Sequence, residues 1–182
     1  MLSQGIPIDE KMRKRLSPVA ENGDTILYEY RPTLFRPLLV NYLPLTFTRR
    51  CRYMYEYLHR GGYRVYYLSQ NDTAVGFCVV TPGGRQLKQS SKEDIVLGPY
   101  YVAAQERGKG YSKTLIRMVL DHYPKGYHGA FDWILRSNEA SIRTTVGCGF
   151  QPIASLNVVG LMRRPVVAED GQYILYWYDR QR

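Results

Sequence analysis

The sequence predicts a single α/β domain, in which helices cover a mixed sheet. Two observations predict this class. Short apolar stretches typical of strands recur along the chain, and the segments between them include stretches whose apolar residues repeat with the helical period. A chain of 182 residues, of which 45% are hydrophobic, is long enough for one core and short for two. No internal repeat or linker-like boundary interrupts it, so we expect residues 1–182 to form one domain.

The first part of the chain is predicted to contain an arm followed by a strand. Residues 1–22 have the character of a short helix or N-terminal arm, because Pro7 and Pro18 limit regular structure. Thr25–Tyr30 alternates as a first strand.

A helical region is predicted next. Residues 31–47 are apolar but contain three prolines, which predicts one short helix and a loop. Thr48 can cap a helix that continues to about Arg60 and ends at the glycine pair beyond it. Its buried side is predicted to consist of Cys51, Met54, Tyr55 and Leu58.

A hairpin and a polar connection follow. Tyr63–Ser69 and Ala74–Thr81 are predicted strands joined across the turn residues 70–72. Residues 82–92 are polar and are predicted to connect this hairpin to the next strand.

The most informative stretch combines a strand, a glycine-bearing loop and a helix. Asp94–Val102 is apolar and aromatic, and Gly98-Pro99 predicts a bulge, because proline cannot donate to a sheet ladder. Gln105–Gly110 is polar and basic, which indicates a loop. A helix is predicted from Tyr111 to near His122, and its apolar face consists of Leu115, Ile116, Val119, Leu120 and Tyr123.

The last part of the chain is predicted to form a strand, a helix and two further strands, in that order. Phe131–Leu135 is a strand, and Ser137 or Asn138 can cap a short helix after it. That helix is predicted to end at Gly149 and to bury Ile142 and Val146. The final strands are Pro152–Met162 and Gly171–Tyr178.

The turn before the helix at Tyr111 has the features of an anion site. The first N–H groups of a helix point outward beside the positive end of its dipole, which suits a phosphate or pyrophosphate. Arg107 and Lys109 add positive charge there. The alternative is a tight connection with solvated charges, since neither G-x-x-x-x-G-K-[ST] nor G-x-G-x-x-G occurs in this stretch.

Composition narrows the classes of partner. The net charge of +9 favours a polyanionic partner, and 17 tyrosines interleaved with arginines could also stack on nucleic-acid bases. No apolar run approaches the roughly 20 residues of a membrane span, and residues 1–20 lack a signal-peptide core, so we expect a cytoplasmic protein without a membrane partner. The three cysteines lack metal-ligand spacing, and we expect no metal site.

Two motifs resemble those of the Gcn5-related N-acetyltransferase (GNAT) family. The first is V-A-A-Q-E-R-G-K-G-Y-S at Val102–Ser112, which is similar to the family's coenzyme A pyrophosphate loop, R/Q-x-x-G-x-G/A. It can be aligned from Gln105 or from Arg107. We prefer Arg107, because Val102 then ends the strand. In that alignment Ser112 stands where glycine or alanine is usual.

The second motif is Asn138-x-x-Ser141 followed by Gly149-Phe150, similar to the family's N-x-x-[AS]…GF helix. Together the motifs imply a single-domain fold with a mixed, mostly antiparallel sheet, flanking helices and a bulged fourth strand that splays from the fifth. The resemblance implies acetyl-CoA as co-substrate, bound by Tyr101, Val102, Ala103, Gln105, Arg107, Gly108, Lys109, Gly110, Tyr111, Ser112, Asn138, Ser141 and Thr145. A plain helix cap is the alternative role for Asn138.

The chemistry that the resemblance implies is direct attack of a primary amine on the thioester. Tyr100 and Tyr101 lie where backbone donors would hold the thioester oxygen. A base or water chain must deprotonate the amine, and the candidates are Glu93, Asp94, Asp132 and His128, each of which could instead be structural or solvated. The family often has a tyrosine acid where this chain has Thr145.

We therefore expect an acetyl-CoA-dependent N-acetyltransferase that acts on a small-molecule or peptide amine. Two alternatives remain open at this point: a non-catalytic or nucleic-acid-binding module on the same fold, and a transferase that uses a longer acyl-CoA. Nucleic acid is the less favoured partner. The acceptor is expected to meet residues 31–62, the 82–92 connection and the final hairpin.

Overall fold

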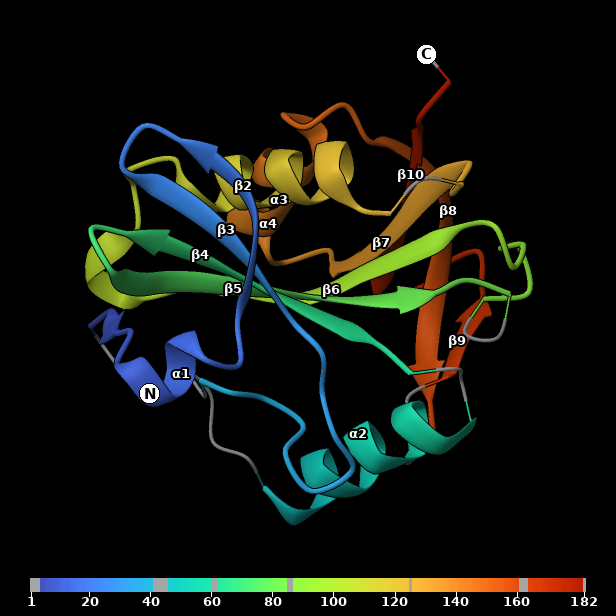
Figure 1. The fold of residues 1–182 in the computed structure, drawn as a ribbon. Coiled ribbons are helices and arrows are strands. Elements are labelled where there is room, and N and C mark those ends of the chain that lie inside the picture. The colour runs from blue at the N-terminus through green and yellow to red at the C-terminus, as the bar shows by residue number, and fades with distance from the viewer. Residues whose placement is uncertain are drawn as a thin grey trace. The chain divides into compact units, whose positions relative to one another are not determined.

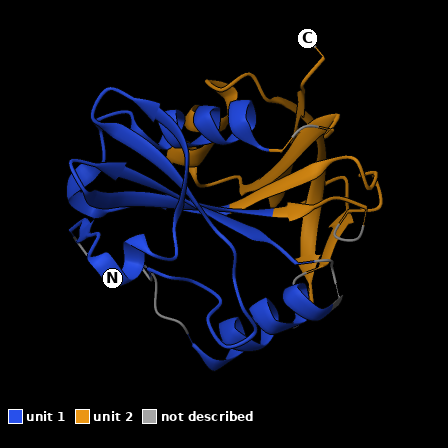
Figure 2. Cartoon of the chain, viewed as in Figure 1, with its two compact units in different colours: residues 1–80, 99–123 blue, residues 81–98, 124–182 orange. Residues whose placement is uncertain are grey.

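The computed structural model describes residues 4–40, 46–59, 62–84, 87–124, 126–160 and 164–181. They form a mixed, mostly antiparallel sheet with α-helices, as the sequence predicts (Figure 1). The chain divides into two compact units, unit 1 with residues 1–80 and 99–123, and unit 2 with residues 81–98 and 124–182 (Figure 2). The grouping of residues 1–182 into one domain remains a prediction.

The sheet of unit 1 is built on antiparallel hairpins. The predicted first strand is confirmed as β3 (Thr25–Tyr30), which pairs with β4 (Arg64–Gln70). The predicted hairpin is confirmed too, because β4 pairs with β5 (Thr73–Pro82). Its turn residues Asn71 and Asp72 have φ angles of 47° and 56°, the left-handed conformation that a tight hairpin turn requires.

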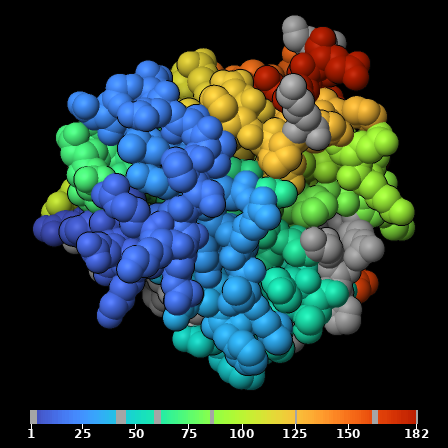
Figure 3. Space-filling model, in the orientation of Figure 1, coloured from blue at the N-terminus to red at the C-terminus, as the bar shows by residue number. Residues whose placement is uncertain are grey.

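The N-terminal residues are more regular than the predicted arm. β1 (Ile6–Pro7) pairs with β5, and β2 (Ser17–Asn22) pairs with β3. Between them lies α1 (Glu10–Arg13). Pro18 is accommodated because the β2 register shifts just after it, at the kind of bulge that tolerates proline. In Figure 3 the N-terminal residues, in blue, form a broad part of the surface of unit 1.

Helix α3 (Tyr111–His122) begins and ends where the sequence predicts. It packs against β2, β3 and β4 (Figure 1), and four of its predicted apolar residues, Leu115, Ile116, Val119 and Leu120, are buried. The other sheet face of unit 1 carries a core rich in aromatic rings, in which Tyr67 packs against Tyr30 and Phe77.

Helix α2 (Phe47–His59) differs from the prediction in its cap and its buried face. Thr46, not Thr48, accepts the capping hydrogen bond, from the Arg49 N–H at 3.4 Å. Met54 and Leu58, predicted as buried, are 44% and 57% exposed. The helix instead buries Tyr53, whose ring centre lies 5.4 Å from that of Tyr63.

The segment before α2 also differs from the prediction. Residues 31–40 contain no helix, and their regular pairing is one bridge between Thr33 and Arg36. Backbone N–H groups of Leu39 and Val40 donate to the Tyr67 hydroxyl, which fixes this segment on the core. The rest of the predicted helix, residues 41–45, lies outside the described residues.

Unit 2 contains the parallel part of the sheet. β6 (Ile95–Val102) begins in unit 2, where Ile95 and Val96 pair in parallel with the start of β7 (Gly129–Leu135). β10 (Tyr173–Asp179) lies between β7 and β8 (Gln151–Val159), antiparallel to both. β9 (Arg164–Val167) adds a short edge strand that the sequence analysis missed.

Helix α4 (Glu139–Val146) follows β7 as predicted, but with another buried face. Val146, expected inside, is 50% exposed, and Ile142 is half-buried. The helix instead buries Thr145 completely, and the Thr145 hydroxyl is satisfied by a hydrogen bond to Asp132 of β7. Among the described residues no helix is long and apolar enough to cross a membrane.

Candidate functional site

The loop between β6 and α3 forms an open turn in unit 1. A 3-10 turn at Ala104–Glu106 leads into Gly108 and Gly110, whose φ angles are 80° and 83°. Such left-handed angles favour glycine. A Cβ atom at either position would meet no atom within 4 Å, so open space lies beside both glycines.

The N-terminus of α3 has the geometry of an anion site. Gly110 is the N-cap residue and has no side chain with which to cap the helix, although its carbonyl accepts from the Lys113 and Thr114 N–H groups at 3.0 and 3.1 Å. The preceding N–H groups, of Tyr111 and Ser112, lie at the positive end of a 12-residue helix. Helix N-termini of this kind are sites at which phosphate groups bind.

The two basic side chains of the loop have different surroundings. The Arg107 guanidinium lies 5.1 Å from the centre of the Tyr101 ring, and its Nε donates to the Val102 carbonyl at 3.3 Å. Lys109 is exposed and pairs with Glu106 at 2.9 Å, so part of its charge is offset. Because the charge of Lys109 is partly offset, Arg107 is the better placed of the two to attract an anion.

The residues just before these charges fix the loop to the sheet. Val102 and Ala103 are buried, and the Ala103 N–H donates to the Val75 carbonyl of β5 at 2.8 Å. Gln105 is exposed. We therefore find the predicted loop residues together in one turn, with Val102 and Ala103 in a supporting position.

The backbone of β6 is distorted where the sequence predicts a bulge. Gly98 has a φ of 105°, far from strand values, and is partly exposed. Tyr100 and Tyr101 follow it, also partly exposed, near the end of the strand. The splay of this strand from the next stays a prediction.

Asp132 and Thr145 meet in the interior of unit 2. The Thr145 hydroxyl donates to Oδ2 of Asp132 at 3.0 Å. Burial raises the pKa of Asp132 to about 7, and the hydrogen bonds from Thr145 and the Trp133 backbone lower it only in part. Asp132 is thus a carboxyl group that changes from its protonated to its ionised form near neutral pH.

The remaining candidate bases have structural partners. Glu93 and His128 are both exposed and pair with each other at 3.1 Å. The Asp94 carboxylate accepts from the Ser91 N–H at 2.6 Å, which closes the turn before β6. The sequence indicated neither pairing.

Asn138 caps α4, the alternative that the sequence left open. Its side-chain oxygen accepts from the Ser141 N–H at 3.3 Å. Contact of Asn138, Ser141 and Thr145 with a coenzyme stays a prediction.

Unit 2 also has a surface hollow of about 440 Å³, within the range of small-molecule sites. Two of its residues come from the connection that was expected to face the acceptor, and two from the final strands. Its lining consists of Gln89, Ser91, Asp94, His128, Phe131, Ile153 and Trp177.

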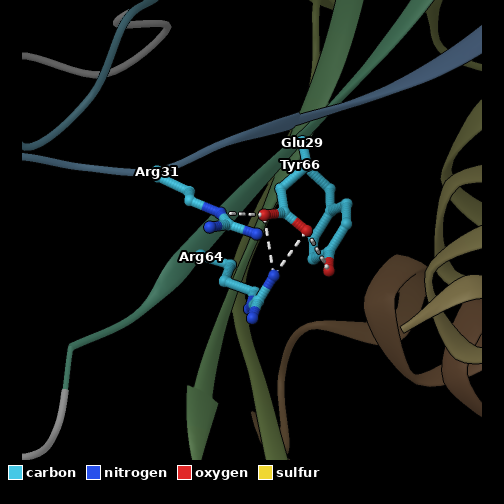
Figure 4. A network of polar contacts seen from close by, with 4 residues as sticks. All are labelled: Glu29, Arg31, Arg64 and Tyr66. Carbon is cyan, nitrogen blue, oxygen red and sulfur yellow. Dashed lines mark hydrogen bonds and ion pairs between the residues drawn. The ribbon is translucent and has the colours of Figure 1, made fainter. Parts of the chain in front are cut away.

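An ion cluster around the buried Glu29 in unit 1 was not predicted from the sequence (Figure 4). Glu29 of β3 pairs with Arg64 at 2.6 Å and with Arg31 at 2.8 Å, and the Tyr66 hydroxyl lies 3.3 Å from the same carboxylate. Burial alone would raise the pKa of Glu29, but hydrogen bonds from the two arginines outweigh it and hold the pKa low. A glutamate within the apolar stretch T-I-L-Y-E-Y was the available signal.

Comparison with known proteins identifies a family model and a set of similar folds. The acetyltransferase (GNAT) family model matches residues 27–150. The putative acetyltransferase yncA from Salmonella typhimurium, solved with acetyl-CoA, has 21% identity and a TM-score of 0.52, covering 71% of this chain and 73% of its own. The microcin C7 self-immunity acetyltransferase MccE, in complex with acetyl-CoA and AMP, has 14% identity and a TM-score of 0.58, covering 91% and 99%.

An N-acetyltransferase from Staphylococcus aureus Mu50 has 26% identity and a TM-score of 0.50, covering 76% of this chain and 78% of its own. No curated protein sequence matches the chain.

Proposed function

Since the chain belongs to the acetyltransferase (GNAT) family, we propose that it transfers the acetyl group of acetyl-CoA to a primary amine by direct attack. The open glycine turn at the N-terminus of α3 carries this proposal, because its geometry fits a pyrophosphate. The acetyl-CoA complexes of the Salmonella protein and MccE, which share the fold, support acetyl-CoA as the co-substrate.

The pyrophosphate is assigned to the loop of unit 1. Its oxygens would accept from the N–H groups at the start of α3, beside the open faces of Gly108 and Gly110. Arg107 would supply a positive charge held beside Tyr101, and Lys109 a second one that Glu106 partly offsets. Tyr101, Val102, Ala103 and Gln105 would shape the approach to this turn.

Other residues are assigned to the rest of the coenzyme. Backbone groups at Tyr100 and Tyr101 would hold the thioester oxygen, where charge develops as the amine attacks. Asn138 and Ser141 would line its path along α4, whereas Thr145, predicted from the sequence to contact the coenzyme, is fully buried and would support this path from inside the helix. For the amine, Glu93 remains a candidate base, because it is exposed and its carboxylate pairs with the equally accessible His128.

The acceptor is assigned to the hollow of unit 2. Phe131 and Trp177 form an aromatic wall, with ring centres 4.5 Å apart, and the acidic residue Asp94 belongs to the same lining. An aromatic face beside a carboxylate attracts an ammonium ion that carries an apolar body. Small molecules and peptides of this chemistry both qualify, as does a protein acceptor that presents such a group.

Two measurements test the proposal. Acetyl-CoA at about 100 times its dissociation constant should stabilise the protein by roughly 2.7 kcal/mol, with a rise in Tm. A panel of primary amines, including diamines and aromatic amines, should then release free coenzyme A thiol.

Other outcomes of these measurements count against the proposal. No stabilisation by acetyl-CoA, together with salt-dependent binding of single-stranded RNA, would favour the nucleic-acid-binding module. Stabilisation and turnover only with a longer acyl-CoA would replace the acetyl donor.

A further inference from the structure

The leaving group of the proposed reaction needs a proton donor. The leaving group is the thiol of coenzyme A, whose pKa is about 8.5 by analogy with cysteine. Its thiolate must therefore be protonated as it departs, or leave unassisted. The Thr145 hydroxyl is far too weak an acid for this task. It does, however, orient a second group, the Asp132 carboxyl, through their 3.0 Å hydrogen bond.

The two oxygens of Asp132 have different surroundings. Oδ2 accepts from Thr145, whereas Oδ1 lies 3.8 Å from where a Cβ of residue 98 would stand. Residue 98 is glycine, and it is partly exposed while Asp132 is only 3% exposed. The missing side chain at Gly98 therefore leaves a narrow opening beside Oδ1, at the distorted part of β6.

Burial is the main influence on the charge of Asp132. Tyr176 lies directly opposite on β10, and Arg136 at the end of β7 acts on that tyrosine. On α4 the charged residues Glu139 and Arg143 are exposed and pair with each other. The β6 residues Ile95–Gly98 include no titratable side chain. With these surroundings the pKa of Asp132 rises to about 7, so it retains its proton in part of the molecules at neutral pH.

We propose that Asp132 donates the proton to the coenzyme sulfur through the opening at Gly98, with Thr145 as its positioning residue. This inference rests on the proposed function. As the new N–C bond forms and the C–S bond breaks, the O–H bond of Asp132 breaks and an S–H bond forms. The attacking nitrogen loses one proton, which passes through water to the Asp132 carboxylate and restores its acid form.

The pH dependence of kcat tests the proposal. Because the protonated carboxyl is the active form, kcat of the parent should fall above about pH 7 with the slope of one proton. Asp132→Asn keeps the shape of the side chain and an acceptor for Thr145, but it cannot donate this proton. We expect it to lose the decline above pH 7 and to lower kcat by about 10²–10⁴-fold, with an unchanged Kd for acetyl-CoA.

Two variants at Thr145 separate positioning from packing. The Thr145 hydroxyl lowers the pKa of Asp132, so Thr145→Val should move the decline in kcat to higher pH. Thr145→Ser retains the hydroxyl and should leave the decline in place. A carbon-13 NMR titration of the Asp132 carboxyl, without coenzyme, should show the same order of pKa values.

The outcomes distinguish this inference from the proposed function. If the parent binds acetyl-CoA and turns over, but Asp132→Asn keeps kcat within tenfold and the same pH profile, the proton-donor role is wrong and the acetyltransferase remains. If Asp132→Asn does not fold, unchanged pH profiles in both Thr145 variants overturn the inference. A parent that neither binds acetyl-CoA nor releases thiol overturns both.

Discussion

Arg64 and Glu29 lie on neighbouring strands, and Nη1 of the arginine contacts both carboxylate oxygens, at 2.7 and 2.6 Å. The glutamate side chain is 10% exposed, so its charge depends on this partner. Removal of one member of a buried pair leaves the other poorly compensated, and here the exposed Arg31 would remain as the partner of Glu29.

Arg64→Met should therefore lower the free energy of unfolding by about 3 kcal/mol. Denaturant unfolding measures it. Arg31→Ala is the matched control, because Arg31 contacts the same carboxylate from an 80% exposed position. Its effect should stay within about 1 kcal/mol. Equal losses in the two variants would contradict the distinction between them.

Gly110→Asp should weaken acetyl-CoA binding at least about tenfold, equal to about 1.4 kcal/mol. The change brings a side chain and a negative charge to the proposed pyrophosphate turn. Isothermal titration calorimetry measures the Kd.

Gly23→Asp controls for backbone strain in this experiment. Gly23 also has a positive φ and open space around its Cβ position, but it lies in the turn between β2 and β3. The Gly23→Asp variant should bind acetyl-CoA with the same Kd as the parent. A folded Gly110→Asp protein with an unchanged Kd would show that the coenzyme binds elsewhere.

The buried Asp132 carboxyl should also affect stability. Its pKa is about 7 in the folded protein and near 4 when unfolded, so the folded state holds more protons between these values. The contribution of Asp132 to stability is therefore complete below about pH 4 and is lost as pH rises to about 7.

Unfolding of the parent and of Asp132→Asn across pH 4–8 checks this sign. The stability of the parent relative to the variant should fall up to about pH 7 and then level off. A constant difference over this range would mean that the carboxyl does not titrate with a raised pKa.

Two substitutions of opposite charge at Ile153 test the acceptor hollow. Ile153 lines the hollow and is 50% exposed, so substitution there should not disturb the core. Ile153→Lys should raise the KM for a cationic amine about fivefold, corresponding to roughly 1 kcal/mol between charges near the surface. Ile153→Glu should lower it or leave it unchanged.

The Kd for acetyl-CoA is the internal control at Ile153, and neither variant should change it. Equal KM values in the lysine and glutamate variants would place the acceptor outside this hollow.

The sequence predicted the regular elements best where local pattern and packing agree. The bounds of β3 follow from the alternating pattern of Thr25–Tyr30. The start of α3 follows from the glycine turn before Tyr111. The glycine turn itself was predictable, because left-handed angles and a helix start are local properties.

Properties that depend on distant residues were not predictable. The buried face of α2 is set by Tyr63, just before β4, and that of α4 by Asp132. The Glu29 cluster joins residues 35 positions apart, and the hollow of unit 2 gathers residues from Gln89 to Trp177. No spacing in the sequence indicates such meetings.

The attachment of the N-terminal residues bears on how the protein could be shortened. β2 covers one edge of β3, whose residues Leu27–Tyr30 are buried. A chain that began at residue 24 would keep every residue assigned to the coenzyme, yet it would expose that edge as a row of unpaired backbone groups beside an apolar surface. Such an edge recruits other chains, so a shortened form would be prone to aggregate.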